Sequence, residues 1–466
     1  MKPIAIIGGG ITGLTAAFRL QQKNVPVVLY EAGKRVGGVI QSVRHDGYLA
    51  ESGPNSILET SPVIGSLIAD LGLEDRRFYS DERAGKRFLV RGSKPVAMPS
   101  SFLGFLFTPL FSTSAKLRLG LEPFIRRTEP DKEESLADFV VRRLGREFLD
   151  YAINPFVAGV YAGDPAHLSV KHAFPKLHDL ERRYGSLIKG QFLGARERKR
   201  RAEVSKQNAK KLSFDEGLQV LPDAIATRLG VSIRTNSPVT RLERQGEEWI
   251  VSARHEDSET QCSHSAVVYA APPLHLPEIC LGGRSIDYSP LSQIYYPPVA
   301  TLVLGFRRED VAHPLDGFGM LVPEVEPFNI LGTLFSSTLF PRRAPEGHVT
   351  LTTYLGGCRA PHLAETDPIS RLNLVLHDLR ILLGVRGEPT FVHYAQFRHA
   401  IPQYDVGYGR FKALMTEIEQ NAPGLFFAGH YRDGIALSDS ILSGHNVAAR
   451  VSTFAHSRLN HVSVAA

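Results

Sequence analysis

The sequence predicts an α/β protein in which a parallel-sheet domain is interleaved with an antiparallel-sheet domain and a helical insertion. Three observations indicate this fold class. The chain begins with a strand, helix and strand pattern around clustered glycines, residues from about 100 to 212 are rich in helix formers, and residues 295–395 hold repeated strand signals. At 466 residues the chain is also too long for one compact core, so several domains are expected.

The N-terminal segment has the pattern of a βαβ unit. Residues 3–7 are a short apolar run rich in β-branched side chains, residues 14–22 are amphipathic, and residues 25–31 are a second apolar run. A strand, a helix and a strand within about 30 residues form the unit from which parallel sheets are built.

Residues 8–13 read GGGITG and fit the GxGxxG pattern between that strand and helix. Gly8 permits the tight turn, Gly10 lets backbone approach a pyrophosphate, and Gly13 lets the helix pack closely on the sheet. Glu31 ends the second strand, 18 residues after Gly13, where a carboxylate accepts hydrogen bonds from a ribose diol. The unit therefore predicts a dinucleotide site. The contacts expected in it are Gly8, Gly10, Ile11, Thr12, Gly13, Glu31 and Ala32.

Two further stretches favour a flavin over a nicotinamide dinucleotide. "EAGKRVGG" supplies a cation and unhindered backbone through Arg35, Gly37 and Gly38. Near the C-terminus, "FFAGHYRDGIALSD" reads as a buried strand, a glycine turn and a helix. Together these stretches resemble the flavin amine oxidase-like oxidoreductases, which hold FAD. The resemblance implies that the C-terminal strand returns to the first sheet, so that both ends of the chain form one FAD site.

The remaining pattern divides the chain into segments. "SLADFVVRRLGREFLDYA" has helical periodicity, whereas "VATLVLGF", "NILGTLFSS" and "HVTLTTYLGG" predict strands of a mostly antiparallel sheet. We expect three interleaved parts. These are an FAD-binding Rossmann-like domain (1–85, 213–272 and 396–466), an antiparallel-sheet domain (86–100 and 273–395) and a helical insertion (101–212). The family resemblance given below implies that the second part binds substrate and that the third binds a membrane.

The net charge of +6 is local, because residues 196–211 hold eight Lys and Arg against two Glu. Such a run is most often a solvated face, and we expect no nucleic-acid partner. Cys262, Cys280 and Cys358 lie far apart, without the spacing of a disulfide framework or a zinc site, so a reducing compartment is expected. The first strand follows Lys2 directly, so we expect no signal or transit peptide and a cytoplasmic protein.

An apolar stretch precedes a group of cations early in the predicted insertion. Residues 102–111 hold four Phe and three Leu, and Lys116, Arg118, Arg126 and Arg127 follow. This pattern is typical of a helix that lies in a membrane interface. A buried helical hairpin explains the same residues equally well.

Beyond the cofactor motifs, residues 4–450 resemble the oxygen-dependent protoporphyrinogen oxidases of plants and many bacteria. The resemblance is carried by "ESGPNSILE", "KRFLVRG", "YAINPFVAGVYAGDPAHLSVKHAFPKL", "TLFSSTLFP" and "AIPQY". It implies that Arg87 pairs with a propionate and that the Gly159 carbonyl faces the pyrrole N–H groups. Substrate contacts are implied at Arg87, Gly159, Leu321, Leu334 and Tyr354, and further cofactor contacts at Gly53, Pro54, Val239, Phe397, Gly429, Ile435 and Ala436.

The chain departs from the family pattern near its C-terminus and before Gly217. His430, Asp433 and Ser438 stand where the family commonly has other residues, and Asp215 and Glu216 precede a single glycine. We interpret His430 as structural rather than as a proton acceptor. No metal cluster or nucleophilic triad stands out, so we name no catalytic residue and no metal ligand.

The resemblance implies an FAD-dependent oxidase that converts protoporphyrinogen IX to protoporphyrin IX in haem biosynthesis. Three two-electron hydride abstractions to flavin N5 are implied, with O2 reduced to H2O2. Coproporphyrinogen III oxidation and another flavin amine oxidase or desaturase activity are the alternatives. The family also suggests a homodimer held peripherally at the inner face of the cell membrane.

Overall fold

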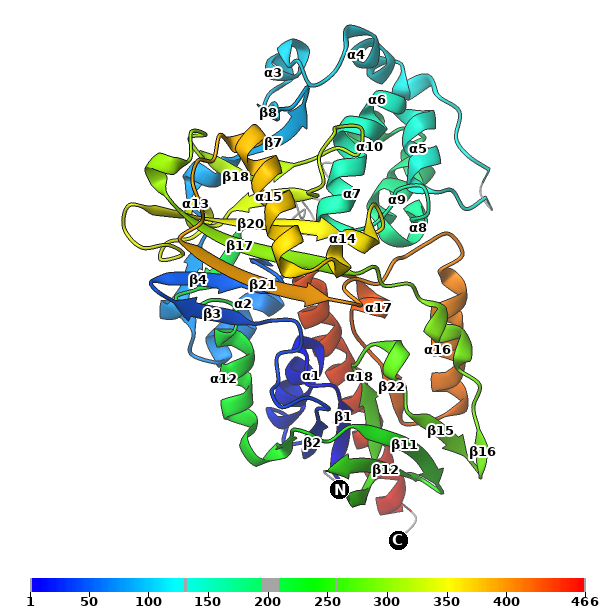
Figure 1. Cartoon of the computed structure of the whole chain (residues 1–466). Helices are drawn as coiled ribbons and strands as arrows, with labels where there is room; N and C mark the ends of the chain where they lie inside the picture. Colours follow the sequence, from blue (N-terminus) through cyan, green and yellow to red (C-terminus); the bar gives the residue numbers. More distant parts are fainter. Residues whose placement is uncertain (1, 130–131, 195–208, 256–257, 465–466) are drawn as a thin grey trace.

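A five-stranded parallel sheet forms the centre of the part of the protein that contains both chain ends (Figure 1). The computed structural model describes residues 2–129, 132–194, 209–255 and 258–464. The strand order is β10-β2-β1-β14-β22, and every pair is parallel. The strands are β1 (Ile4–Ile7), β2 (Val27–Tyr30), β10 (Ile233–Arg234), β14 (Ala266–Tyr269) and β22 (Leu425–Phe427). The expected return of the C-terminal strand to the N-terminal sheet is confirmed.

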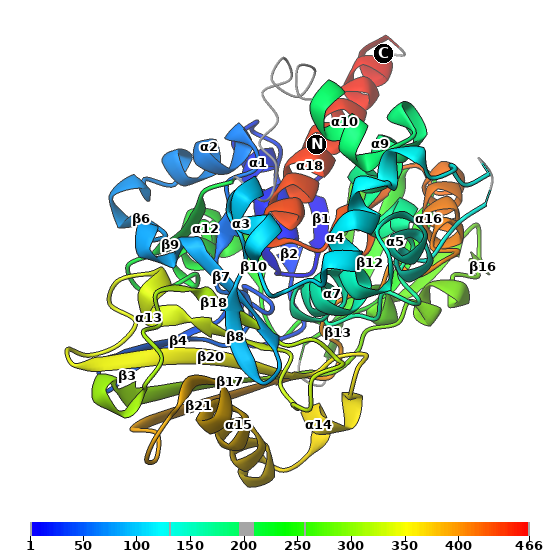
Figure 2. The same cartoon turned by 90° about the horizontal axis from the view of Figure 1, so that it is seen from above.

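Helices from both ends of the chain cover this sheet. α1 (Ile11–Gln21) follows β1 and packs along α18 (Leu437–Val464), which Figure 2 shows running beside it. A β-carbon at Gly444 would overlap the carbonyl oxygen of Thr12, so only glycine fits where the two helices meet. The further helices of this part are α2 (Pro62–Asp70), α12 (Val220–Leu229), α16 (Gly409–Asn421) and α17 (His430–Asp433).

Three further sheets extend this part of the molecule. The strand order of the largest is β13-β12-β11-β15-β16, and it crosses the expected domain boundary at residue 272. Its strands are β11 (Val239–Gln245), β12 (Glu248–His255), β13 (Ser258–His264), β15 (Glu278–Leu281) and β16 (Arg284–Ser285). The other two sheets contain β3 (Ser42–His45) with β4 (Tyr48–Glu51), and β5 (Ile57–Leu58) and β6 (Arg77–Tyr79) on either side of β9 (Lys211–Phe214).

A seven-stranded sheet of order β21-β17-β20-β19-β18-β7-β8 forms the second large layer. All its pairs are antiparallel except β18 with β7, which confirms the expected mostly antiparallel sheet. Its strands are β7 (Lys86–Arg91), β8 (Lys94–Ala97), β17 (Val299–Arg307), β18 (Gly317–Leu321), β19 (Gly332–Phe335), β20 (His348–Gly356) and β21 (Phe391–Phe397).

One helix in this layer corrects the expectation that residues 295–395 alternate as strands. α15 (Pro368–Leu383) begins at an N-cap, where the Asp367 carboxylate accepts the N–H groups of Ile369 and Ser370. Its buried apolar residues recur at helical spacing and pack on one face of the sheet. On the opposite face, β4 covers the part around Val303 and Phe391. Two short helices, α13 (Ser336–Leu339) and α14 (Pro361–Glu365), lie at strand ends.

The insertion is helical, as expected, and a buried ion cluster holds it together. Arg143 is fully buried and pairs with Glu122 and Glu181, so removing one partner would leave a buried charge uncompensated. Its helices are α3 (Phe102–Phe107), α4 (Thr113–Gly120), α5 (Leu136–Arg143), α6 (Arg146–Phe148), α7 (Asn154–Tyr161), α8 (Val170–Ala173), α9 (Pro175–Tyr184) and α10 (Leu187–Leu193). Most of the basic run 196–211, up to residue 208, lies outside the described residues.

α3 exposes its apolar side chains to solvent. Phe102 is 73% exposed, Leu103 66% and Phe107 84%, so the buried-hairpin interpretation does not hold for these residues. Phe124, Phe192 and Leu193, which follow later in the insertion, are also exposed. Within the described ranges, no helix combines the length and hydropathy needed to cross a bilayer.

Candidate active site

The turn between β1 and α1 has the backbone geometry that the glycine pattern predicts. Gly8 adopts a φ of +104°, and a β-carbon there would lie 2.9 Å from the Ala271 nitrogen. A β-carbon at Gly13 would overlap the carbonyl oxygen of Gly8, so α1 packs on β1 only with glycine at this position. At Gly10 a β-carbon would meet no described atom within 4 Å. Open space therefore adjoins the N-terminus of α1, where anions bind.

Glu31 lies directly after β2 and faces this turn. Its Oε2 accepts the Gly9 N–H at 2.7 Å, and its Oε1 accepts the Gly33 N–H at 2.7 Å. Ala32 beside it is exposed, and the backbone of Ser237, two residues before Val239, donates to the Glu31 carbonyl at 2.8 Å. The segment that leads into Val239 thus lies beside Glu31, although the two are far apart in the sequence.

The loop after β2 folds back over the glycine turn. The Gly37 N–H donates to the Gly9 carbonyl at 2.8 Å, and a β-carbon at Gly38 would lie 3.3 Å from the Gly10 α-carbon. Arg35 donates to the loop carbonyls of Val36, Ile40 and Gly38 at 2.8–3.1 Å. Arg35 therefore holds the loop in shape, and its contact with a pyrophosphate stays a prediction.

Gly53 and Phe397 meet although they are far apart in the sequence. A β-carbon at Gly53 would overlap the Val39 carbonyl oxygen and would lie 3.7 Å from Cζ of Phe397. Pro54 follows in the same half-buried loop. These predicted cofactor contacts therefore form one continuous surface with the loop that covers Gly10.

The contacts of the C-terminal turn explain one departure from the family pattern, Asp433. The Gly429 N–H donates to Ser443 Oγ at 2.8 Å, and that hydroxyl donates to the Asp433 carboxylate. Asp439 accepts the Ala436 N–H at 3.2 Å, at the start of α18. The carboxylates of Asp433 and Asp439 therefore stabilise the turn. Because the Asp433 carboxylate accepts the Ser443 hydroxyl, it has a structural role and is not assigned as a base.

Two buried polar atoms beside this turn lack a partner among the described residues. They are Nε2 of His430 and Oγ of Ser438. Burial lowers the pKa of His430 to about 4, so its imidazole is neutral at pH 7. Because buried polar atoms in proteins are almost always hydrogen-bonded, these two fit contacts with a polar ligand. With the open space at Gly10, they show that the residues present suit a dinucleotide.

The predicted substrate residues lie on one face of the seven-stranded sheet, opposite the face that α15 covers. Cross-strand partners share a face, and so do residues two apart on one strand. Leu321 pairs with Leu89 on one side and with Gly332 on the other. Gly332 also pairs with Tyr354, whose other partner is Thr301. Leu334, two residues after Gly332, pairs with Gly319 and Thr352. Arg87 lies two residues before Leu89 and therefore shares the face, as does Phe397 through its pairing with Val299.

Gly159, on α7, lies directly against this substrate face. A β-carbon there would overlap Cδ2 of Leu321. Leu321, Leu334 and Tyr354 remain partly exposed although their strands lie inside the sheet. The partly exposed side chains of this face therefore suit contact with a flat apolar ligand, with α7 beside it.

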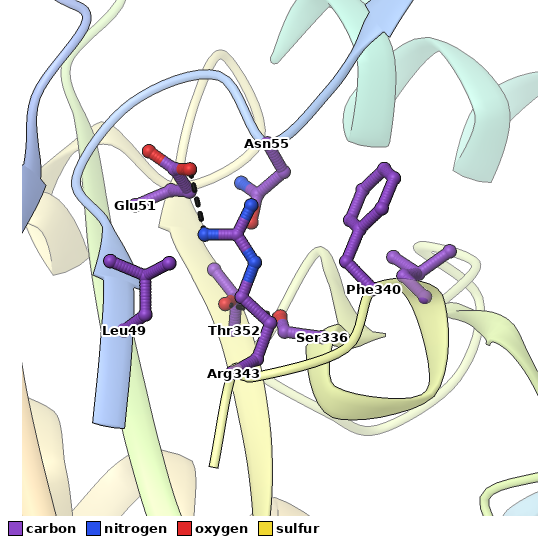
Figure 3. Close-up of a pocket in the computed structure, with 8 residues that line it drawn as sticks. Leu49, Glu51, Asn55, Ser336, Phe340, Arg343 and Thr352 are labelled. Carbon is purple, nitrogen blue, oxygen red and sulfur yellow. Dashed lines mark hydrogen bonds and ion pairs between the residues drawn. The ribbon is translucent and has the colours of Figure 1, made fainter. Parts of the chain in front are cut away.

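Asn55 joins the cofactor loop to the substrate face, a role that sequence reasoning missed. Its Nδ2 donates to the Tyr354 hydroxyl at 2.6 Å and to the Gly53 carbonyl at 3.2 Å. The only sequence signal was its place two residues after Gly53, within "ESGPNSILE". A small cavity opens next to Asn55 (Figure 3). Its lining includes Thr352 from the substrate face and the buried Glu51–Arg343 ion pair, whose atoms are 2.8 Å apart.

Comparison with known proteins agrees with this geometry. Residues 11–452 match the profile of the "Flavin containing amine oxidoreductase" family, which confirms the expected flavin cofactor. The chain is 36% identical to protoporphyrinogen oxidase 2 of Arabidopsis thaliana, over 98% of this chain and 95% of that protein. It is 29% identical to coproporphyrinogen III oxidase of Bacillus subtilis (strain 168), over 95% of this chain and 96% of that protein.

Solved structures show the same fold at lower sequence identity. A crystal structure of a candidate protoporphyrinogen oxidase from Exiguobacterium sp. 255-15 superposes with a TM-score of 0.80, at 23% identity over 97% of this chain and 98% of that one. Reduced UDP-galactopyranose mutase superposes with a TM-score of 0.73, at 16% identity over 97% and 96%. The chain belongs to the flavin-containing amine oxidoreductase family and, within it, to the group that includes the protoporphyrinogen oxidases.

Proposed function

We propose that the protein is an FAD-dependent oxidase that converts protoporphyrinogen IX to protoporphyrin IX, with O2 as the electron acceptor. The carrying observation is that Arg87, Leu321, Leu334 and Tyr354 are partly exposed on one sheet face, which Gly159 adjoins and Asn55 joins to the cofactor loop. A flat macrocycle with a carboxylate at one edge suits this arrangement, because apolar side chains contact its faces and a guanidinium binds the carboxylate.

FAD, when bound, supplies the hydride acceptor for this reaction. The residues of the chain position the substrate and exclude water around it. Leu321 and Leu334 provide apolar contact, and the Gly159 backbone carbonyl is our proposed acceptor for the pyrrole N–H groups. Neither His430, which is neutral at pH 7, nor the engaged Asp433 is needed as an acid or base. The substrate is therefore recognised by apolar side chains, by one guanidinium group and by a backbone carbonyl.

A spectroscopic experiment tests cofactor and reaction together. The purified protein should show a flavin spectrum that protoporphyrinogen IX bleaches without oxygen and that air restores. Chromatography of the products should then identify protoporphyrin IX. Coproporphyrinogen III should be tested as a second substrate, because coproporphyrinogen III oxidase of Bacillus subtilis matches nearly the whole chain. Faster oxidation of coproporphyrinogen III would overturn our choice of substrate, and a flavin that neither porphyrinogen reduces would overturn the oxidase itself.

Arg87→Ala tests the proposed substrate site. We expect KM for protoporphyrinogen to rise by about tenfold or more while FAD stays bound, because a charge-assisted hydrogen bond is lost. Arg83→Ala is the matched control, since Arg83 is exposed and pairs with Asp81. Unchanged kinetics in Arg87→Ala would remove Arg87 from the site.

We also propose that α3 attaches the protein to the inner face of the cell membrane. The side chains of Phe102, Leu103 and Phe107 are exposed, and the exposed cations Arg118 and Arg126 follow in the same insertion. Apolar side chains beside cations suit a bilayer interface that carries anionic lipid.

Phe102→Ser combined with Phe107→Ser tests this attachment. The double variant should lose most of its co-sedimentation with vesicles that contain anionic lipid, because two apolar contacts with the bilayer are removed. Ile369→Ser is the matched control, since Ile369 is an exposed apolar residue on α15, outside the insertion. Equal co-sedimentation of the double variant and the wild type would overturn the proposed attachment.

The homodimer stays a prediction that gel filtration tests, and the domain boundaries stay predictions that expression of separate segments tests.

A further inference from the structure

A second cation, Lys211, lies at the Arg87 end of the substrate face. Lys211 begins β9, and its Nζ is 5.5 Å from the centroid of the Phe318 ring. Phe318 lies on β18 and packs in a cluster with Leu334 and Phe340. Because Leu334 is one of the residues of the substrate face, the lysine reaches the edge of that face from a different sheet.

Arg87 lies on β7, the strand that pairs with the Phe318 strand. β18 pairs with β7 through Gly317 with Lys86 and Met320 with Phe88, and the register shifts between these pairs. Phe318 and Gly319 therefore lie opposite Arg87 in the backbone pairing. Burial, together with the nearby Arg87 guanidinium, lowers the pKa of Lys211. The two cations are therefore close enough to repel each other.

Neither cation has a counter-ion among the described residues. Within the part of the chain that the structure describes, the side chains of Arg87 and Lys211 make no ion pair and no hydrogen bond, whereas neighbouring Lys86 pairs with Asp316. Two like charges at a half-buried position are unfavourable without an anion between or beside them. The arrangement is thus incomplete in the protein alone and suits a ligand that carries negative charge.

We propose that Lys211 and Arg87 form a paired site for two neighbouring carboxylates of the substrate, one for each cation. This inference rests on the proposed function. Protoporphyrinogen IX carries its two propionates on adjacent pyrrole rings, at one edge of the macrocycle. Arg87 suits bidentate binding of one carboxylate, and Lys211 acts as a point charge for the other. Lys211 is then a specificity-determining residue that selects substrates with an acidic pair at one edge.

Lys211→Met tests this role in the FAD-bound enzyme. We expect KM for protoporphyrinogen IX to rise by about tenfold with kcat nearly unchanged, because the lost contact binds ground state and transition state alike. Lys211→Arg should restore most of the affinity. Lys210→Met is the matched control, because Lys210 is exposed and its Nζ lies over Tyr79 rather than Phe318.

The dimethyl ester of protoporphyrinogen IX separates charge recognition from a structural role. It lacks both negative charges, so Lys211→Met should leave its KM unchanged. An equal rise of KM for acid and ester, or a Lys211→Met enzyme that equals wild type with the acid, would overturn the inference while the proposed function stands. Failure of the wild type to oxidise the acid at all would instead refute the proposed function, and the Lys211 role with it.

Discussion

The glycine turn after β1 presents backbone to a ligand, whereas the substrate face of the seven-stranded sheet presents side chains. The turn offers backbone, at positions where a β-carbon would overlap protein or enter the open space. The face offers side chains from several strands, which no single backbone turn determines. Substitutions should therefore affect folding and cofactor binding in the first region, and substrate binding alone in the second.

The largest effect is expected at Gly13. In Gly13→Ala the new methyl group overlaps the Gly8 carbonyl oxygen, so β1 and α1 must separate. We expect a loss of about 3 kcal/mol in the free energy of unfolding, together with loss of FAD. Urea unfolding and flavin absorbance of the purified variant measure both quantities.

Gly10→Ala is the matched comparison for that variant. Gly10 has extended backbone with φ of −70°, and its β-carbon would meet no described atom, so the apoprotein should unfold at the same urea concentration as wild type. FAD affinity should fall by roughly thirtyfold, since the methyl group enters the space beside α1. A Gly10→Ala protein that keeps wild-type FAD affinity would show that bound FAD does not occupy the space beside Gly10.

An intermediate effect is expected at Gly159 on the substrate side. Gly159→Ala places a methyl group against Leu321, whose side chain can move, and alanine favours the helix. We expect unchanged or slightly raised stability, retained FAD and a drop of about tenfold in kcat/KM for protoporphyrinogen. Combining it with Leu321→Ala should recover part of the loss, because the overlap is relieved. Loss of FAD in Gly159→Ala would break the proposed division between the two regions.

The smallest effect is expected at His430. Because burial lowers its pKa to about 4, its imidazole does not titrate in the neutral range. His430→Gln should therefore leave the pH dependence of flavin reduction unchanged between about pH 6 and pH 8. Stopped-flow reduction across this range measures it. Disappearance of an inflection in the variant would show that His430 takes part in proton transfer.

The same contrast explains how far the sequence predicted the site. GxGxxG and Glu31 are local and follow from backbone geometry, so residues 8–31 sufficed to predict a dinucleotide site. Arg87 and Tyr354 look like ordinary strand residues, and only the family resemblance singled them out. Asn55 and Lys211 act through contacts between distant segments, which no local pattern shows. α15 was missed because its apolar residues resemble those of the strands around it.

The meeting of α1 and α18 also affects how the protein is made. Thr12 Oγ1 donates to the Ser440 carbonyl, a contact that closes a loop of 428 residues. Closing so long a loop is slow relative to local folding, and β22 must also join β14 before the cofactor sheet is complete. A chain that stops before β22 leaves the apolar surface of α1 uncovered and open to proteases. Only chains that include β22 and α18 complete the cofactor sheet. The yellow colour of bound flavin in a cell extract would therefore come from fully synthesised chains.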